Sequence, residues 1–175
     1  INFAITGSGI HVINLQTSLP PITSTVTIDG WTQSNSNLPP TVELVGSSNS
    51  FDGLVIQSGR STVRGLAFRG FDTALRLEGG TNIIQGNYVG VPLDGTNNVG
   101  NSGDGIYVAS AANQIGGLGA ATANIIGQNA RNGIAFDSTN ARINSVRGNF
   151  IGLSSSGAAA FPTPPSCGRR NVPTA

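Results

Sequence analysis

The acidic residues of this 175-residue chain bear most directly on chemistry, because paired carboxylates act as acid and base and clustered carboxylates hold metal ions. Hydrolysis requires two carboxyl groups at a fixed separation. A base that works beside a Ca2+ ion would need several carboxylates together to hold the ion. The acids occur singly, and the chain has no lysine. They are Asp29, Glu43, Asp52, Asp72, Glu78, Asp94, Asp104 and Asp137. We therefore predict no catalytic residues.

Asp94 and Asp104 are the weak candidates for a metal site. They flank residues 91–102 and could approach each other or a Ca2+ ion there. Each is followed by glycine, and an Asp-Gly pair is explained by turn formation alone. We expect two turn residues and no cofactor, with Ca2+ as the alternative. An enzyme built on this chain would use these two acids and an arginine such as Arg76.

The single histidine and the single cysteine add no chemistry. His11 is expected at a solvent-facing strand position, because no nucleophile motif accompanies it. Cys167 lies in a proline-rich tail with Arg169 and Arg170 close by, which lowers the pKa expected for a thiol. One cysteine excludes an internal disulfide.

The arginines are the best candidates for ligand binding. Four of them fall within one window of seventeen residues, at positions 60, 64, 69 and 76. If they stack on one face, with Tyr107 in the column of Arg76, they could bind an acidic glycan through bidentate pairs and ring contacts. Trp31 either stacks on a sugar or covers the first coils. The candidate ligand-binding residues are Trp31, Arg64, Arg76, Tyr107 and Arg147. Because a solenoid must present soluble residues on its outside, an ordinary polar outer face is the expected role of the arginines, and ligand binding is the alternative.

The elements that position these residues are read from a repeat. The segment NIIQGNYVG at 82–90 returns at 144–152 as NSVRGNFIG. GLVI at 53–56 returns as ALRL at 74–77, as GIYV at 105–108 and as GIAF at 133–136. The extra residues before the third copy form an inserted loop at 91–102. Short apolar strands that return at a long, fixed interval are typical of a solenoid.

The repeat predicts an all-β fold, a right-handed parallel β-helix of about six coils with three short strands per coil. Alternation sends the first and third apolar residues of each copy inward, for example Leu75, Ile106 and Ile134. Asn82, Asn113 and Asn144 lie thirty-one residues apart, and Asn87 and Asn149 are the candidates for inward-facing corner ladders. A two-layer sandwich is the alternative, although it favours hairpin spacing.

Length and composition set the domain organisation. We predict one β-helix domain at 1–161, with N-terminal coils and a cap at 1–46, regular repeats at 53–161 and a proline-rich tail at 162–175. A net charge of +1 offers no basic footprint for nucleic acid. The apolar runs are too short to span a membrane. Because the chain does not begin with Met, we expect a processed piece whose signal peptide lies outside it.

The chain resembles bacterial extracellular proteins of the right-handed parallel β-helix class over about residues 3–161. The segments that carry the resemblance are LPPITSTVTIDGWTQ, STVRGLAFRGF, IQGNYVG, NQIGG, NIIGQN and RGNFIG. Trp31 departs from the small or hydroxylated residue usual at its position. The resemblance implies a pectate-lyase-like superfold in a non-catalytic branch of secreted surface proteins.

Three functions are therefore open. The first is a secreted or cell-surface structural or adhesin module that binds carbohydrate along one face. The second is a polysaccharide-active lyase or hydrolase of the parallel β-helix class. The third is a subunit of an extracellular filament that associates end to end through the open ends of the solenoid.

Overall fold

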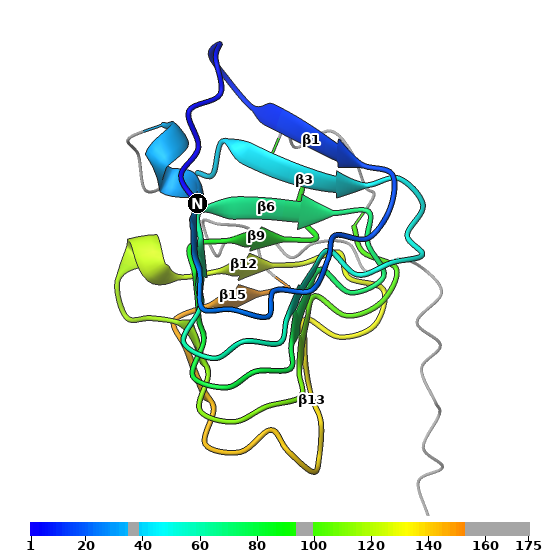
Figure 1. Cartoon of the computed structure of the whole chain (residues 1–175), viewed down its shortest axis with the longest axis vertical. Helices are drawn as coiled ribbons and strands as arrows, with labels where there is room; N and C mark the ends of the chain where they lie inside the picture. Colours follow the sequence, from blue (N-terminus) through cyan, green and yellow to red (C-terminus); the bar gives the residue numbers. More distant parts are fainter. Residues whose placement is uncertain (35–38, 94–99, 153–175) are drawn as a thin grey trace, which may run out of the picture.

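All strand pairs in the computed structural model, which describes residues 1–34, 39–93 and 100–152, are parallel. The six-stranded sheet is stacked in the order β1-β3-β6-β9-β12-β15 (Figure 1). Its strands are β1 (His11–Leu15), β3 (Val42–Gly46), β6 (Leu66–Arg69), β9 (Tyr88–Val89), β12 (Ile125–Ile126) and β15 (Phe150–Ile151). Parallel pairing throughout excludes the sandwich of hairpins.

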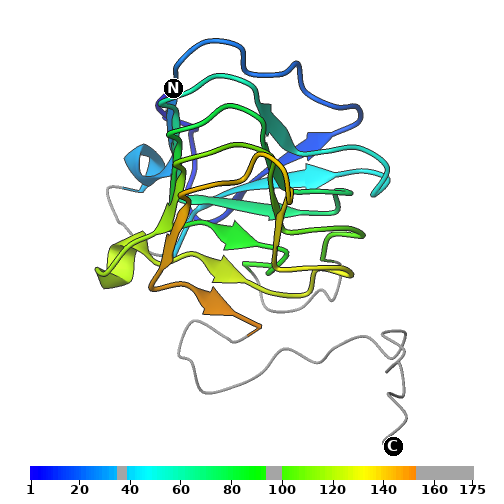
Figure 2. The ribbon, with the colours of Figure 1, turned by 90° about the horizontal axis from the view of Figure 1, so that it is seen from below.

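Two further parallel sheets complete each coil. The five-stranded sheet contains β2 (Thr27–Asp29), β5 (Thr62–Arg64), β8 (Ile83–Gln85), β11 (Gln114–Gly116) and β14 (Ser145–Arg147). The four-stranded sheet contains β4 (Leu54–Ile56), β7 (Leu75–Leu77), β10 (Ile106–Val108) and β13 (Ile134–Phe136). The chain visits the five-, six- and four-stranded sheets in turn, and the coils follow one another along the column (Figure 2). The predicted right-handed parallel β-helix is confirmed.

The first coil is less regular than predicted. Two short strands were expected between residues 1 and 15, but only β1 forms there. Asn2 makes an isolated parallel bridge to Asp29, and Ile22 makes another to Ile56. An end coil has a neighbouring coil on one side only, so parts of it form single β-bridges instead of strands. The predicted tail at 162–175 lies outside the described residues.

The core lies inside the column and follows the predicted register. Ile106 pairs with Leu75 on one side and with Ile134 on the other. Val63, Ile84 and Ile115 form the equivalent stack of the five-stranded sheet, and all three are fully buried. Because successive strand residues point to opposite faces, the residues between these stacks form the outer surface.

Asparagine side chains hold the corners together. In one ladder, Asn82 N donates to Asn113 Oδ1, and Asn113 N donates to Asn144 Oδ1. In the second, Asn87 N donates to Asn124 Oδ1, and Asn124 N donates to Asn149 Oδ1. Each side-chain oxygen thus satisfies a backbone N–H that the turn leaves unpaired. The ladder through Asn87 and Asn149 was predicted, although its middle member Asn124 was not; for Asn82, Asn113 and Asn144 the sequence showed only an even spacing.

The described residues contain two short 3-10 helices and no α-helix. They are η1 (Gly30–Gln33) and η2 (Ala120–Thr122), and both project from the same side of the column (Figure 1). Each lies on the connection from the five-stranded to the six-stranded sheet. Neither they nor any other described segment forms an apolar helix of membrane-spanning length.

Candidate functional site

The arginines of the seventeen-residue window lie on different faces. Arg64 belongs to the five-stranded sheet, Arg69 to the six-stranded sheet and Arg76 to the four-stranded sheet. Each also pairs with a carboxylate, from Asp29, Glu43 and Glu78 respectively. The expectation of one stacked arginine face is therefore wrong. A window of that length runs through most of a coil and so turns past all three sheets.

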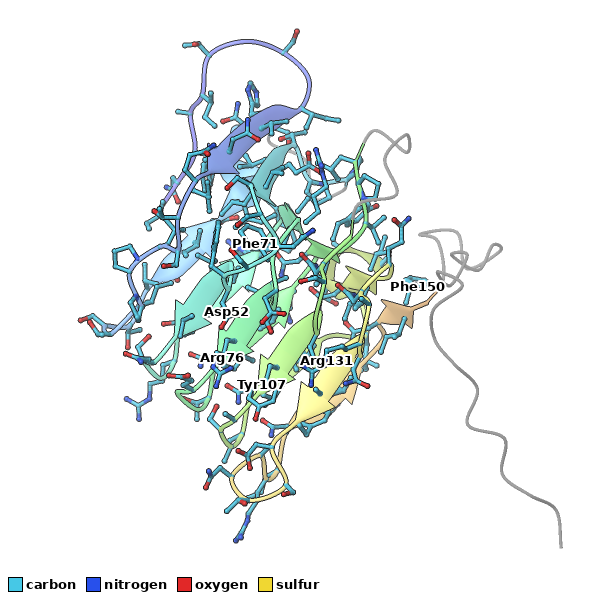
Figure 3. The ribbon with its side chains drawn as sticks, turned by 90° about the vertical axis from the view of Figure 1, so that its right-hand side faces the viewer. Asp52, Phe71, Arg76, Tyr107, Arg131 and Phe150 are labelled. Carbon is cyan, nitrogen blue, oxygen red and sulfur yellow. The ribbon has the colours of Figure 1, made fainter. Side chains whose placement is uncertain are left out.

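Arg76 and Tyr107 are neighbours on the outside of the four-stranded sheet, as predicted. They are paired in the register of β7 and β10, and the Arg76 guanidinium carbon lies 4.8 Å from the centre of the Tyr107 ring (Figure 3). Arg76 Nε also donates to Glu78 Oε1 at 2.7 Å. The guanidinium is thus engaged by a ring and a carboxylate of this chain. This leaves it less available to an anionic ligand.

The pKa of Glu78 should be lower than usual when measured by NMR titration. The hydrogen bond from Arg76 is the main cause, and a second one from Gln57 Nε2 at 3.0 Å adds to it. A lowered pKa in the folded state stabilises the fold at neutral pH, and this contribution is lost as the pH falls through that pKa. We expect the contribution to be small, because the pair is partly exposed. Substituting Arg76→Gln should raise the pKa of Glu78; no change would contradict the assignment.

Trp31 covers the backbone of two coils. Its ring lies so close to Gly65 and Gly86 that a Cβ at either position would be 2.3 Å and 2.5 Å from ring carbons. Both glycines have positive φ, 67° and 61°. The Arg64 guanidinium carbon lies over the Trp31 ring, 4.8 Å from the ring centre. Of the two roles expected for Trp31, covering the first coils is the one that these contacts favour.

A groove runs along the outer surface of the five-stranded sheet at its far end. Its volume is about 500 Å³, and we call it the Gln114 groove. Strands β8, β11 and β14 supply its polar floor, and residues 117–122, which include η2, supply one wall. Gly116 is the register partner of Arg147. The floor and wall residues used below are Gln85, Gln114, Ser145, Arg147, Leu118 and Ile143.

The floor of the Gln114 groove offers both donors and acceptors. Gln85 Nε2 and Gln114 Nε2 donate to Gly116 O at 3.3 Å and 3.1 Å. Neither glutamine Oε1 accepts a hydrogen bond from the described residues, so both remain available. Arg147 Nε donates to Ser145 Oγ at 2.8 Å. Within the described ranges no carboxylate pairs with Arg147, in contrast to Arg64, Arg69 and Arg76. The groove therefore carries an uncompensated positive charge.

Sequence reasoning found part of this groove. It placed Gln85 and Arg147 in equivalent positions of the segments 82–90 and 144–152, and both line the groove. It missed Gln114 and Ser145, although the alignment of QIGG at 114–117 with the neighbouring repeats puts both on the outer face. The wall at 117–122 belongs to no repeat and gave no signal.

The acidic candidates do not form a described site. Asp94 lies outside the described residues. Asp104 is 4% exposed, and its Oδ1 accepts hydrogen bonds from Asn132 N at 3.0 Å and Asn132 Nδ2 at 2.8 Å. It therefore bonds one coil to the next, which agrees with a role in a turn. In the described part of the chain, no three His, Cys, Asp or Glu residues gather as metal ligands would.

His11 and Cys167 complete the sequence candidates. His11 Nε2 lies 3.0 Å from Gln33 Nε2, and the same amide donates to Ile5 O. These contacts link β1, η1 and the N-terminal segment, so His11 helps to hold the first coil together. Cys167 lies outside the described residues.

Comparison with known proteins gives no further assignment. No protein-family model matches the chain, and neither a curated protein sequence nor a solved structure does.

Proposed function

We propose that the chain is a non-catalytic β-helix module of a secreted or cell-surface protein that binds carbohydrate in the Gln114 groove. The observation that carries the proposal is the floor of this groove. There, amide oxygens, a hydroxyl and a guanidinium are presented on rigid strands rather than on loops. Sites on such elements hold their geometry without a ligand, which lowers the cost of binding.

The mixture of donors and acceptors fits sugar hydroxyls. A hydroxyl group donates one hydrogen bond and accepts others, so it needs both kinds of neighbour. Gln85 and Gln114 supply acceptors, while Arg147 supplies donors. These residues come from three successive coils, which lie about 4.8 Å apart. A linear polysaccharide running along the column would therefore meet a new polar side chain at each coil.

Carbohydrate binding is tested with a glycan array of neutral and acidic polysaccharides, followed by titration calorimetry on any glycan that binds. We expect Arg147→Gln to weaken binding by about tenfold or more, since a charge-assisted hydrogen bond is lost. Arg131→Gln is the matched control, because Arg131 is also exposed but does not line the groove. Failure of the unmodified chain to bind any glycan, or equal loss in both variants, would contradict the proposal.

A further inference from the structure

One corner has a left-handed backbone in each of four successive coils. The residues two positions before β5, β8, β11 and β14 have φ values of 59°, 62°, 60° and 58°. They are Arg60, Thr81, Ala112 and Ile143. The corner is fixed by the next coil, since Arg60 N donates to Gly80 O, Thr81 N to Ala111 O and Ala112 N to Arg142 O. The geometry therefore belongs to the β-helix and not to the residue that occupies it.

Ile143 is the least suitable of these four residues for the corner. A left-handed backbone suits glycine and asparagine, and it is most strained for a β-branched residue. Burial of the side chain would offset this cost, but Ile143 is 89% exposed. The fold thus holds an isoleucine in a disfavoured conformation without gaining buried apolar surface. Backbone strain of this kind is a reason to look for a function of the strained residue.

A second exposed aliphatic residue stands at the same groove. Leu118 is 87% exposed and lies in the wall that leads into η2, and it lines the Gln114 groove together with Ile143. They are the two most exposed of the large apolar side chains in the described residues. The groove therefore combines a polar floor with two apolar side chains at its border.

We propose that Ile143 and Leu118 are ligand-binding residues that pack against the C–H faces of pyranose rings in the Gln114 groove. The inference rests on the proposed function and adds the apolar half of the recognition. A pyranose presents apolar ring faces and a rim of hydroxyls, so it matches apolar side chains above a floor of amides and a guanidinium. Contact with a ligand would bury the isoleucine that the free protein leaves exposed.

A peptide fits this groove less well. Extended peptides bind to sheets mainly through backbone hydrogen bonds at a free edge. The Gln114 groove lies on the face of the five-stranded sheet, where β11 is paired on both sides by β8 and β14. Its backbone groups are consequently engaged, and only side chains face the ligand. Hydroxyl-rich chains need no backbone partners, and this favours a glycan.

The test compares Ile143→Asn with Arg60→Asn in the whole chain. Asparagine tolerates the left-handed corner, so we expect Ile143→Asn to raise the melting temperature by about 2–4 °C. It should also weaken binding of the glycan identified on the array by about tenfold, because the apolar contact is lost. Arg60→Asn introduces the same residue at the equivalent corner three coils away. It should leave the affinity unchanged. Leu118→Ser should reproduce the loss of affinity without the gain in melting temperature.

The outcomes separate this inference from the proposed function. Glycan binding with equal affinity in the unmodified chain, Ile143→Asn and Leu118→Ser would overturn the inference and leave the proposed function standing. No glycan binding by the unmodified chain would overturn both. Binding of a peptide library in place of glycans, lost in Ile143→Asn, would also overturn the inference, since it would make the ligand a peptide.

Discussion

Replacing Arg69 by methionine is expected to lower the free energy of unfolding by about 3–5 kcal/mol. Arg69 Nε and Nη2 donate to the two carboxylate oxygens of Glu43 at 3.0 Å and 3.2 Å, joining β6 to β3. Glu43 is only 4% exposed. The variant would leave its carboxylate buried without a counter-charge, and that desolvation cost is the reason for the large effect. Urea unfolding followed by circular dichroism measures the change.

Two variants show whether the buried charge is responsible. The double variant Glu43→Leu with Arg69→Met removes both charges and should recover most of the lost stability, because an apolar pair of similar volume replaces the ion pair. Arg76→Met breaks a similar pair whose side chains are 37% and 32% exposed, and it should cost at most about 1 kcal/mol. A double variant as unstable as Arg69→Met would show that lost packing, not the unpaired carboxylate, causes the effect.

The register of the β-helix was predictable because each coil repeats the same alternation. A strand whose first and third residues are apolar can bury them in one way only, and a shift by one residue would expose both. This is why the pairing of Leu54 with Leu75, and of Val63 with Ile84, could be read from spacing alone. Asn87 and Asn149 followed for the same reason, since equivalent turns leave equivalent N–H groups unpaired.

The faces on which the arginines lie were not predictable in the same way. Spacing identifies residues that occupy equivalent positions in successive coils, such as Arg64 and Gln85. It does not show how many corners the chain turns between two residues of the same coil. Gly65 has a φ of 67° and turns the chain directly after Arg64, so Leu66 already belongs to another sheet. Recognising such single-residue corners would have separated Arg64 from Arg69.

The groove depends on contacts that no repeat contains. Its wall at 117–122 is an insertion between β11 and β12, and its shape comes from local bonds such as Thr122 Oγ1 to Gly119 O. An insertion has no equivalent in the neighbouring coil, so its position cannot be inferred by register. The strain at Ile143 could not be predicted for a different reason. Its positive φ is imposed by the corner of the coil, and the sequence does not show which residue occupies that corner.

Replacing Asn124 by leucine is expected to cost about 3–5 kcal/mol, because several buried groups lose their partners at once. Asn124 is fully buried. Its Oδ1 accepts from Asn87 N at 2.9 Å and from Asn87 Nδ2 at 3.2 Å, and its Nδ2 donates to Ile84 O at 2.8 Å. Leucine has a similar volume but neither group, so the loss isolates the hydrogen bonds from packing. Urea unfolding again gives the magnitude; a change below about 1 kcal/mol would show that water replaces the side chain.

The variant Asn124→Asp makes the same ladder sensitive to pH. The new carboxylate keeps the acceptor for Asn87 but faces the carbonyl oxygen of Ile84 without a proton to donate. Burial and this repulsion should raise the pKa of the introduced carboxyl in the folded state. A raised pKa means that stability is greatest when the group is protonated and falls as the pH rises through the folded value.

Asn124→Asp should therefore be more stable, relative to the unmodified chain, at about pH 4 than at about pH 7. Asn14→Asp, on the exposed side of β1, should show no such dependence, and equal pH profiles for the two variants would refute a buried, ordered ladder.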